Sequence, residues 1–197
     1  EHLIDNSAKY LSVRGPLTAK FLRSCGGPDI KSFGDPAALI SRVIPLQRNK
    51  TNGLIALVRH ASHDRVPLVL PENFVEWDIL VSHPDQIQKF LYELMKYDEV
   101  VTSAMHVLIV CQSYGIPCSL VTFEGLENSI SGTGLKYSDY SLGVGLKELH
   151  PVIVERDLRN LPLSSVRQTE VIHESIKDEI ESKLLESIDV IWEQRAT

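Results

Sequence analysis

The stretch VVTSAMHVLIVCQSYGIP, residues 100–117, decides what kind of fold this chain adopts. Its β-branched beginning, together with Glu99, predicts a short strand over 99–103, and the apolar run that follows predicts a buried helix over 104–114. The next segment, CSLVTFE at 118–124, predicts another strand. A strand, a helix and a strand in this order are typical of a parallel sheet, because neighbouring parallel strands need a crossover connection.

The same alternation extends outward from this stretch in both directions. Segments 15–27 and 84–99 predict helices, the second with its apolar residues on one face. Alternating strands and helices indicate an α/β fold, here a Rossmann-like, mostly parallel sheet with flanking helices. The region 125–150 has no clear period, and from about Ser164 apolar residues in steps of four predict a long amphipathic helix. Further strands are predicted at 8–14, 29–33, 53–60 and 74–82.

Composition and charge favour an ordinary globular protein. The chain has 197 residues, of which 43% are hydrophobic and 23% are charged. Its net charge of −6 counts against nucleic-acid binding, because phosphate backbones favour basic surfaces. No apolar run reaches the ~18 residues of a membrane span, and no signal-peptide pattern opens the chain. The three cysteines lack metal-ligand spacing and indicate a reducing compartment, so we expect a cytoplasmic protein without a metal.

Polar side chains follow the predicted strands, at the places where each strand ends. Parallel sheets bind ligands in the crevice at the carboxyl ends of their strands, so these residues are the candidates for a site. Arginines and histidines are prominent among them, which suits a small anionic ligand. The candidates are Arg14, Asp35, Arg59, His60, Ser82, His83, the run Ser103–His106 and Glu124.

His106 stands out in the apolar stretch because an imidazole ring titrates near neutral pH. If Ser103 caps the helix, His106 is the third helical residue and lies in the first turn, where unpaired amides and the positive dipole end favour an anion. The same field favours neutral imidazole, whereas a bound anion would favour imidazolium. Such a ring could accept a proton when the site is empty and donate one when an anion is bound. The alternative is a histidine that caps or packs locally and does no chemistry.

Four short motifs occur in an order that resembles the polysaccharide pyruvyl transferase family. They are YLSVRGPLTAKFL (10–22), FGDPAALI (33–40), LVRH (57–60) and the stretch 100–117. In that family a V-R-G-x-x-T segment and a D-P-A segment precede a strand–loop–helix that reads T-S-x-x-H, an apolar run and G-I-P. The resemblance covers roughly residues 8 to 150.

The resemblance implies a fold similar to the C-terminal half of a two-domain GT-B glycosyltransferase. Residues 1–45 are then expected to be the tail end of a preceding Rossmann-like domain, most of which lies upstream. Residues 46–163 are expected to form the C-terminal Rossmann-like domain, and 164–197 the long amphipathic C-terminal helix.

The resemblance also implies an activity and roles for single residues. Family members transfer the enolpyruvyl unit of phosphoenolpyruvate to a sugar of a polysaccharide or its lipid-linked precursor, usually forming a cyclic ketal, and no cofactor is expected. His106 matches the histidine taken as the catalytic acid or base, and Arg14 matches the arginine expected to hold phosphoenolpyruvate. Some members have an arginine where this chain has Ala104, so Arg59 or His60 could supply that charge.

Four further residues complete the expected substrate-binding set. Ser103 and Glu124 follow predicted strands, and Glu124 could bind a sugar hydroxyl or simply be solvated. Lys136 and Tyr137 follow the glycine-containing segment SISGT, which only superficially resembles a phosphate loop and is interpreted as a flexible rim loop. His63 is interpreted as an ordinary loop histidine.

Two other functions stay open at this point. A glycosyltransferase of the same fold would bind a nucleotide sugar, and a non-catalytic domain would bind a sugar or an anion without turnover. The expected partners are phosphoenolpyruvate and a saccharide acceptor, with no nucleic acid. Peripheral membrane association through a lipid-linked acceptor and a homo-oligomer are both compatible with the sequence.

Overall fold

The chain forms two compact units in the computed structural model, which describes residues 8–130, 134–168 and 170–195. The first unit belongs to residues 1–39, 135–149 and 172–197, and the second to residues 40–134 and 150–171. Each unit is described by itself below. The domain boundaries expected after residues 45 and 163 stay a prediction.

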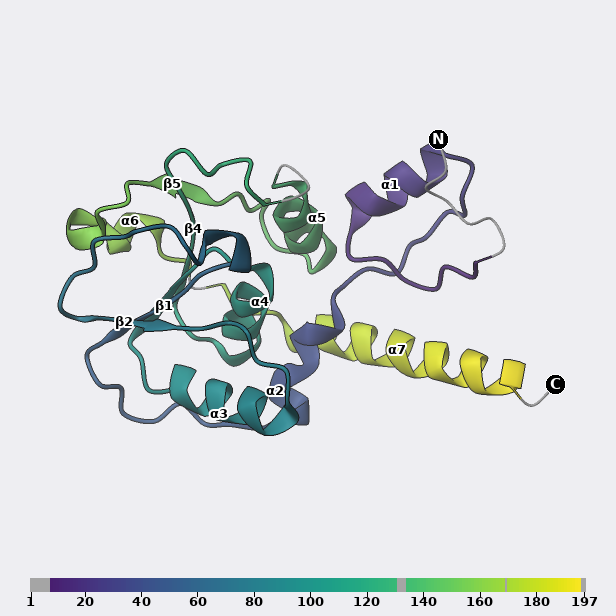
Figure 1. Ribbon diagram of the computed structural model, residues 1–197. Coiled ribbons are helices and arrows are strands. Elements are labelled where there is room, and N and C mark those ends of the chain that lie inside the picture. The colour runs from purple at the N-terminus through teal and green to yellow at the C-terminus, as the bar shows by residue number, and fades with distance from the viewer. Residues whose placement is uncertain (1–7, 131–133, 169, 196–197) are drawn as a thin grey trace. The chain divides into compact units, whose positions relative to one another are not determined.

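The second unit is built on a five-stranded sheet in which all neighbouring strands are parallel (Figure 1). The strand order is β2-β1-β3-β4-β5, so the chain crosses over β1 to reach β3. This confirms the predicted Rossmann-like α/β sheet with flanking helices. The strands are β1 (Ile55–Val58), β2 (Phe74–Trp77), β3 (Glu99–Thr102), β4 (Cys118–Phe123) and β5 (Val152–Val154).

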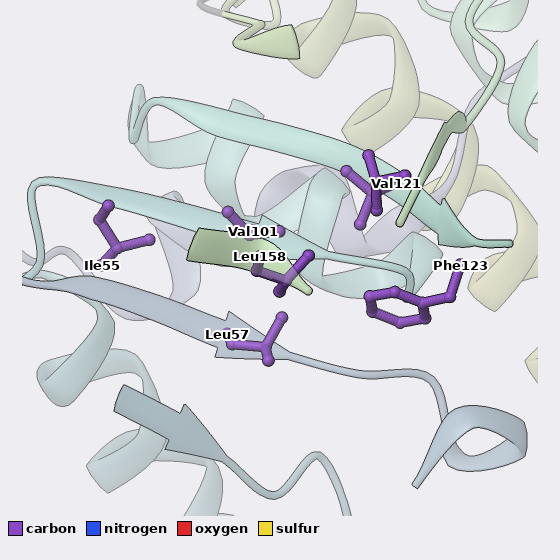
Figure 2. Packing of buried hydrophobic residues seen from close by; sticks show 7 residues of the cluster. Ile55, Leu57, Val101, Val121, Phe123 and Leu158 are labelled. Atoms are coloured by element: carbon purple, nitrogen blue, oxygen red, sulfur yellow. The ribbon is translucent and has the colours of Figure 1, made fainter. Parts of the chain in front are cut away.

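The central strands are buried on both faces, which explains their nearly continuous apolar sequences. One face carries a hydrophobic cluster contributed by β1, β3, β4, β5 and the short 3-10 helix Leu158–Asn160 (Figure 2). Partly buried leucines such as Leu68 and Leu70, from the connection between β1 and β2, pack against this cluster. The cluster consists of Ile55, Leu57, Val101, Val121, Phe123, Val154 and Leu158.

Helices α3 and α4 cover the opposite face of the sheet (Figure 1). Helix α3 begins at a proline and buries one stripe, as its amphipathic sequence predicted. Helix α4 is apolar on nearly all sides. Its C-cap residue is Gly115, whose φ of 70° lies in the left-handed region that favours glycine. The helices of the chain are α1 (Pro16–Ser24), α2 (Ile40–Val43), α3 (Pro84–Leu94), α4 (Met105–Tyr114), α5 (Leu135–Gly143), α6 (Leu163–Val166) and α7 (Glu174–Arg195).

The first unit is helical where it is regular. Helix α1 packs against α5, and α7 packs against the 3-10 helix Pro36–Leu39. Gly15, just before α1, lies so close to α5 that an added Cβ would meet the Asp139 carbonyl oxygen at 1.8 Å. The glycine of the V-R-G motif is therefore explained by close packing of two helices, not by backbone strain, since its φ is −166°.

Several predicted elements were wrong in extent or kind. Segments 8–14 and 29–33 were expected to be strands, but within the described residues they are joined by only one bridge, Val13–Phe33. A strand needs a ladder of backbone partners, and a favourable side-chain pattern does not supply one. The strand predicted at 74–82 ends at Trp77, so Ser82 and His83 do not follow a strand end.

The region 125–150 contains helix α5, although its sequence showed no period. The tail helix begins at Glu174 and not near Ser164. Of its expected apolar stripe, Ile180 is buried at 5% exposure, whereas Leu184 is exposed at 36%.

Candidate active site

The loops that follow β1, β3 and β4 meet at the carboxyl edge of the sheet, because these three strands are adjacent and parallel. These loops and the start of the helix that follows β3 carry five of the residues singled out in the sequence. This is the edge at which ligands bind in open parallel sheets. The five residues are Arg59, His60, Ser103, His106 and Glu124.

His106 lies in the first turn of α4, as its second residue. Of the ten residues of α4, all of them described, His106 alone is exposed, while Met105 and Val107 beside it are buried. The helix therefore holds the imidazole ring at the surface of the carboxyl edge on an otherwise buried support. An acid or base placed in this way can reach a ligand without disturbing the core.

Ser103 does not cap α4, so the condition that would make His106 the third helical residue is not met. The N-cap residue is Ala104, whose amide donates to Thr102 Oγ1 at 3.0 Å. Thr102 in turn donates to the Val58 carbonyl at 2.7 Å, which holds the start of the helix to the end of β1. Ser103 is fully buried, and its hydroxyl binds residues of the loop after β1 instead of the start of α4. Its contact with a substrate stays a prediction.

A buried histidine joins the three loops. His63 is 0% exposed, with Nδ1 at 2.9 Å from Ser103 Oγ and Nε2 at 2.7 Å from Ser129 Oγ. Ser103 Oγ also accepts the His60 amide at 2.9 Å. The His63 ring packs edge-on against Phe123 at 5.4 Å between centroids. Nothing in the sequence singles out His63, because a histidine among Ser, Asp and Arg is typical of a solvated loop.

Arg59 already has several partners. Its Nε donates to Glu76 Oε1, Nη2 pairs with the same oxygen, and Nη1 donates to the carbonyls of His63 and Val66 at 2.7 Å each. The side chain is only 11% exposed. These contacts fix the loop after β1 and would compete with an anion for the guanidinium group. The role of Arg59 as a phosphate ligand stays a prediction, and these contacts count against it.

His60 and Glu124 lie closer to solvent. The His60 ring is half-buried, and its Nδ1 accepts the Ser62 amide at 3.1 Å, which leaves Nε2 as the protonated nitrogen of the neutral ring. Glu124 is exposed, and its carbonyl accepts Arg156 Nε at 3.2 Å. Neither placement tests the expected contact with a substrate.

In the first unit, Arg14 and Lys136 come together although 121 residues separate them. Arg14 Nε lies 3.4 Å from Asp35 Oδ2, and its side chain is 37% exposed. Burial first, and then the charge of Arg14, lower the pKa of Lys136 below its usual 10.5. Two cations that influence each other electrostatically favour an anionic ligand between them.

Arg14 and Asp35 also line a groove of about 440 Å³ in the same unit. Two lysines, Lys9 and Lys183, line it as well, and Lys183 pairs with Glu186 at 2.6 Å. Positive side chains thus outnumber the single carboxylate of the lining, which favours an anionic occupant.

Lys136 and Tyr137 were expected on a flexible rim loop, and this was wrong. Both belong to helix α5, and Tyr137 is 1% exposed. Burial raises the pKa of Tyr137 to about 12, so its phenol stays protonated near neutral pH. The Lys136 ammonium lies 5.3 Å from the centroid of that ring. Gly132 of the same segment lies outside the described residues.

At the start of α1, the amides of the first turn bind a carboxylate of the protein itself. The Asp139 carboxylate accepts the amides of Leu17 at 2.8 Å and Thr18 at 3.1 Å through Oδ1, and the Thr18 hydroxyl through Oδ2. Asp139 is itself buried. The threonine of the V-R-G-x-x-T motif thus has a structural role, and only Arg14 of that motif is left for a ligand.

The expected site residues divide between the units. Arg14, Lys136 and Tyr137 belong to the first unit, and Arg59 and His106 belong with their neighbours to the second. A single crevice shared by Arg14, Arg59 and His106 therefore stays a prediction.

The described residues contain no group of three or more His, Cys, Asp or Glu side chains that could hold a metal ion. Within the same part of the chain, none of the helices combines the length and apolar character that crossing a membrane requires. The expectations of no cofactor and of a cytoplasmic location stay predictions.

Comparison with known proteins gives one match. The family model described as polysaccharide pyruvyl transferase matches residues 2–123, while no curated protein and no solved structure matches the chain. The matched stretch runs from before α1 to the end of β4, so it includes Arg14 and His106 and stops just before Glu124. Because it spans more than half of the 197 residues, the chain belongs to the polysaccharide pyruvyl transferase family and is a transferase.

Proposed function

We propose that this transferase moves the enolpyruvyl unit of phosphoenolpyruvate onto a sugar of a polysaccharide or of its lipid-linked precursor and closes it as a ketal. Family membership supplies the general activity and a saccharide acceptor. The donor, the lipid-linked form of the acceptor and the roles of single residues belong to the proposal. So do the cytoplasmic location, the peripheral membrane association and the GT-B-like arrangement with a preceding domain.

His106 is the acid and base of the proposed reaction. Its imidazolium donates a proton to the methylene carbon of phosphoenolpyruvate, which becomes a methyl group and leaves the central carbon electrophilic. A sugar hydroxyl oxygen attacks that carbon and gives its proton to the neutral imidazole. The bond between the central carbon and the phosphate oxygen breaks, and a second hydroxyl closes the ketal as its proton leaves with phosphate.

The observation that carries this role is the exposure of His106 at the start of a helix that is otherwise buried. A histidine kept only for packing would be expected to face the core of this helix. Its place at the carboxyl edge of the parallel sheet supports the same interpretation.

Arg14 and Lys136 hold the carboxylate and phosphate of the donor in this proposal. Arg14 is partly exposed, has a single carboxylate partner, and lines a groove large enough for a small molecule. Lys136 adds a second cation beside it. Some family members have an arginine at the position of Ala104. His60 replaces that arginine better than Arg59 does, because Arg59 already makes four donor contacts within the protein.

The donor can be tested by mixing the active enzyme with phosphoenolpyruvate and a panel of saccharides, and measuring released phosphate together with ketal formation by mass spectrometry. We expect one phosphate for each ketal. Release of a nucleoside diphosphate from nucleotide sugars, without phosphate release from phosphoenolpyruvate, would contradict the proposal and favour a glycosyltransferase.

A matched pair of variants tests the anion site. Arg14→Ala should weaken phosphoenolpyruvate binding roughly tenfold or more, because a charged hydrogen bond is worth about 1.5–3 kcal/mol. Arg23→Ala is the control, since Arg23 lies on α1 with a side chain that is 73% exposed. Equal affinities for the two variants in calorimetry would remove Arg14 from the donor site.

A further inference from the structure

We propose that His63 is a positioning residue for the transfer reaction, holding the loop that carries His60 and the turn that carries His106 through the hydroxyl of Ser103. This rests on the proposed function for its link to turnover. His63, Ser103 and Ser129 come from the loops after β1, β3 and β4, and His63 and Ser103 are completely buried.

For a neutral His63 ring, the hydrogen-bond chain runs in one direction. The Ser129 hydroxyl donates to the Leu126 carbonyl at 2.6 Å, so its oxygen accepts from His63 Nε2. If the buried ring is neutral, as the proposal requires, it carries one proton, so Nδ1 accepts and the Ser103 hydroxyl donates to it. The Ser103 oxygen remains able to accept the His60 amide, as it does at 2.9 Å. His63 is therefore assigned as the neutral Nε2–H tautomer.

The bond between Nδ1 and Ser103 bears directly on the site. Ser103 is two residues before the start of α4 and three before His106, so fixing its hydroxyl orients the first turn of that helix. The same hydroxyl fixes the backbone of His60. The bond from Nε2 to Ser129 holds the loop after β4. Along the chain, Ser129 is farther than Ser103 from both His60 and His106. The two ring nitrogens thus have separable effects.

Two substitutions separate the two nitrogens. In His63→Asn the amide oxygen takes the place of Nδ1 and can still accept from Ser103, whereas the bond to Ser129 is lost. In His63→Gln the amide nitrogen takes the place of Nε2 and can still donate to Ser129, whereas the bond to Ser103 is lost. Both replace a buried ring by an amide, so their losses in folding stability should be similar.

Steady-state kinetics of the active enzyme give the expected contrast. His63→Asn should keep kcat within about threefold of the wild type, and His63→Gln should lower it roughly 10- to 100-fold, because a small misplacement of a catalytic group is costly. The KM for phosphoenolpyruvate should change little in either variant. In a Ser103→Ala background the two variants should no longer differ.

A structural measurement separates this inference from the proposed function. Nitrogen NMR of the ring should show the Nε2–H tautomer of His63, and exchange of the His60 amide should be slow in wild type and His63→Asn but faster in His63→Gln. Equal kcat values for the Asn and Gln variants, an Nδ1–H tautomer, or equal exchange rates would overturn the inference. A wild-type enzyme that does not use phosphoenolpyruvate but shows the expected tautomer and exchange rates would overturn only the proposed function.

Discussion

Helices α1 and α4 both begin in a motif of the pyruvyl transferase family, yet their first turns are used differently. At α1, the amides of Leu17 and Thr18 bind the buried carboxylate of Asp139. At α4, the cap is Ala104, and the first turn presents the exposed ring of His106. One helix start therefore contains its own anion, and the other offers a titratable group to a ligand.

The contrast shows that a helix start inside a functional motif is not in itself a binding site. The positive end of a helix dipole favours an anion, and a side chain of the protein can be that anion. In the first unit the positive charges left for a ligand are on the side chains of Arg14 and Lys136. In the second unit the group left for chemistry is His106.

The largest expected effect tests whether the α1 start is structural. Asp139→Ala should lower the free energy of unfolding by about 3 kcal/mol, because it removes charged hydrogen bonds and leaves partly buried donors without this acceptor. His106→Ala should change it by less than about 0.5 kcal/mol, since an exposed ring makes few packing contacts. Urea denaturation of both variants measures this difference. Similar stability losses would mean that the two helix starts are not used differently.

The next effect concerns the approach of α5 to α1. Gly15→Ala should cost about 2 kcal/mol, because its Cβ would overlap the Asp139 carbonyl and force the helices apart. Gly26→Ala is the matched control, since nothing lies within 4 Å of its added Cβ and only its φ of 85° is unfavourable. Thermal unfolding compares the two. A larger loss for Gly26→Ala would contradict the close packing at the α1 start.

The smallest expected effect is a pH dependence of donor binding. Because burial and then Arg14 lower the pKa of Lys136 below 10.5, its ammonium loses its proton at a lower pH than that of an ordinary lysine. Phosphoenolpyruvate binding should weaken as pH rises through that lowered pKa, and Lys136→Met should remove this weakening. Calorimetry from about pH 7 to above the usual lysine value of about 10.4 measures this weakening. A wild-type affinity that stays constant throughout would remove Lys136 from the anion site.

The sheet could be predicted from the sequence because burial on both faces leaves a direct trace in the chain. β1 is a continuous apolar run, β3 and β4 are mostly apolar and completely buried, and α4 between β3 and β4 is apolar at most of its positions. The predicted strand at 8–14 failed because local pattern contains no information about a pairing partner. Helix α5 was missed because it buries polar residues such as Ser138 and Asp139, and the partners of Asp139 are distant in sequence.

The candidate site could be predicted in part. The exposed histidine on an apolar helix and the arginine of V-R-G both follow from motifs, and the proximity of Arg14 to Lys136 depends on folding alone. His63 and Asp139 were not found, since each is defined by hydrogen bonds across at least 40 residues. A buried polar network has no periodic signature in sequence.

Single-turnover kinetics of His106→Ala, with phosphoenolpyruvate binding measured alongside, test the central claim that the α4 start does the chemistry. His83→Ala is the matched control, because His83 is also a histidine at a helix start, with a side chain 68% exposed. We predict that His106→Ala lowers turnover by roughly 10²–10⁴-fold while binding changes much less, and that His83→Ala leaves turnover unchanged. Near wild-type turnover in His106→Ala would contradict the account and leave His106 as a surface residue without chemistry.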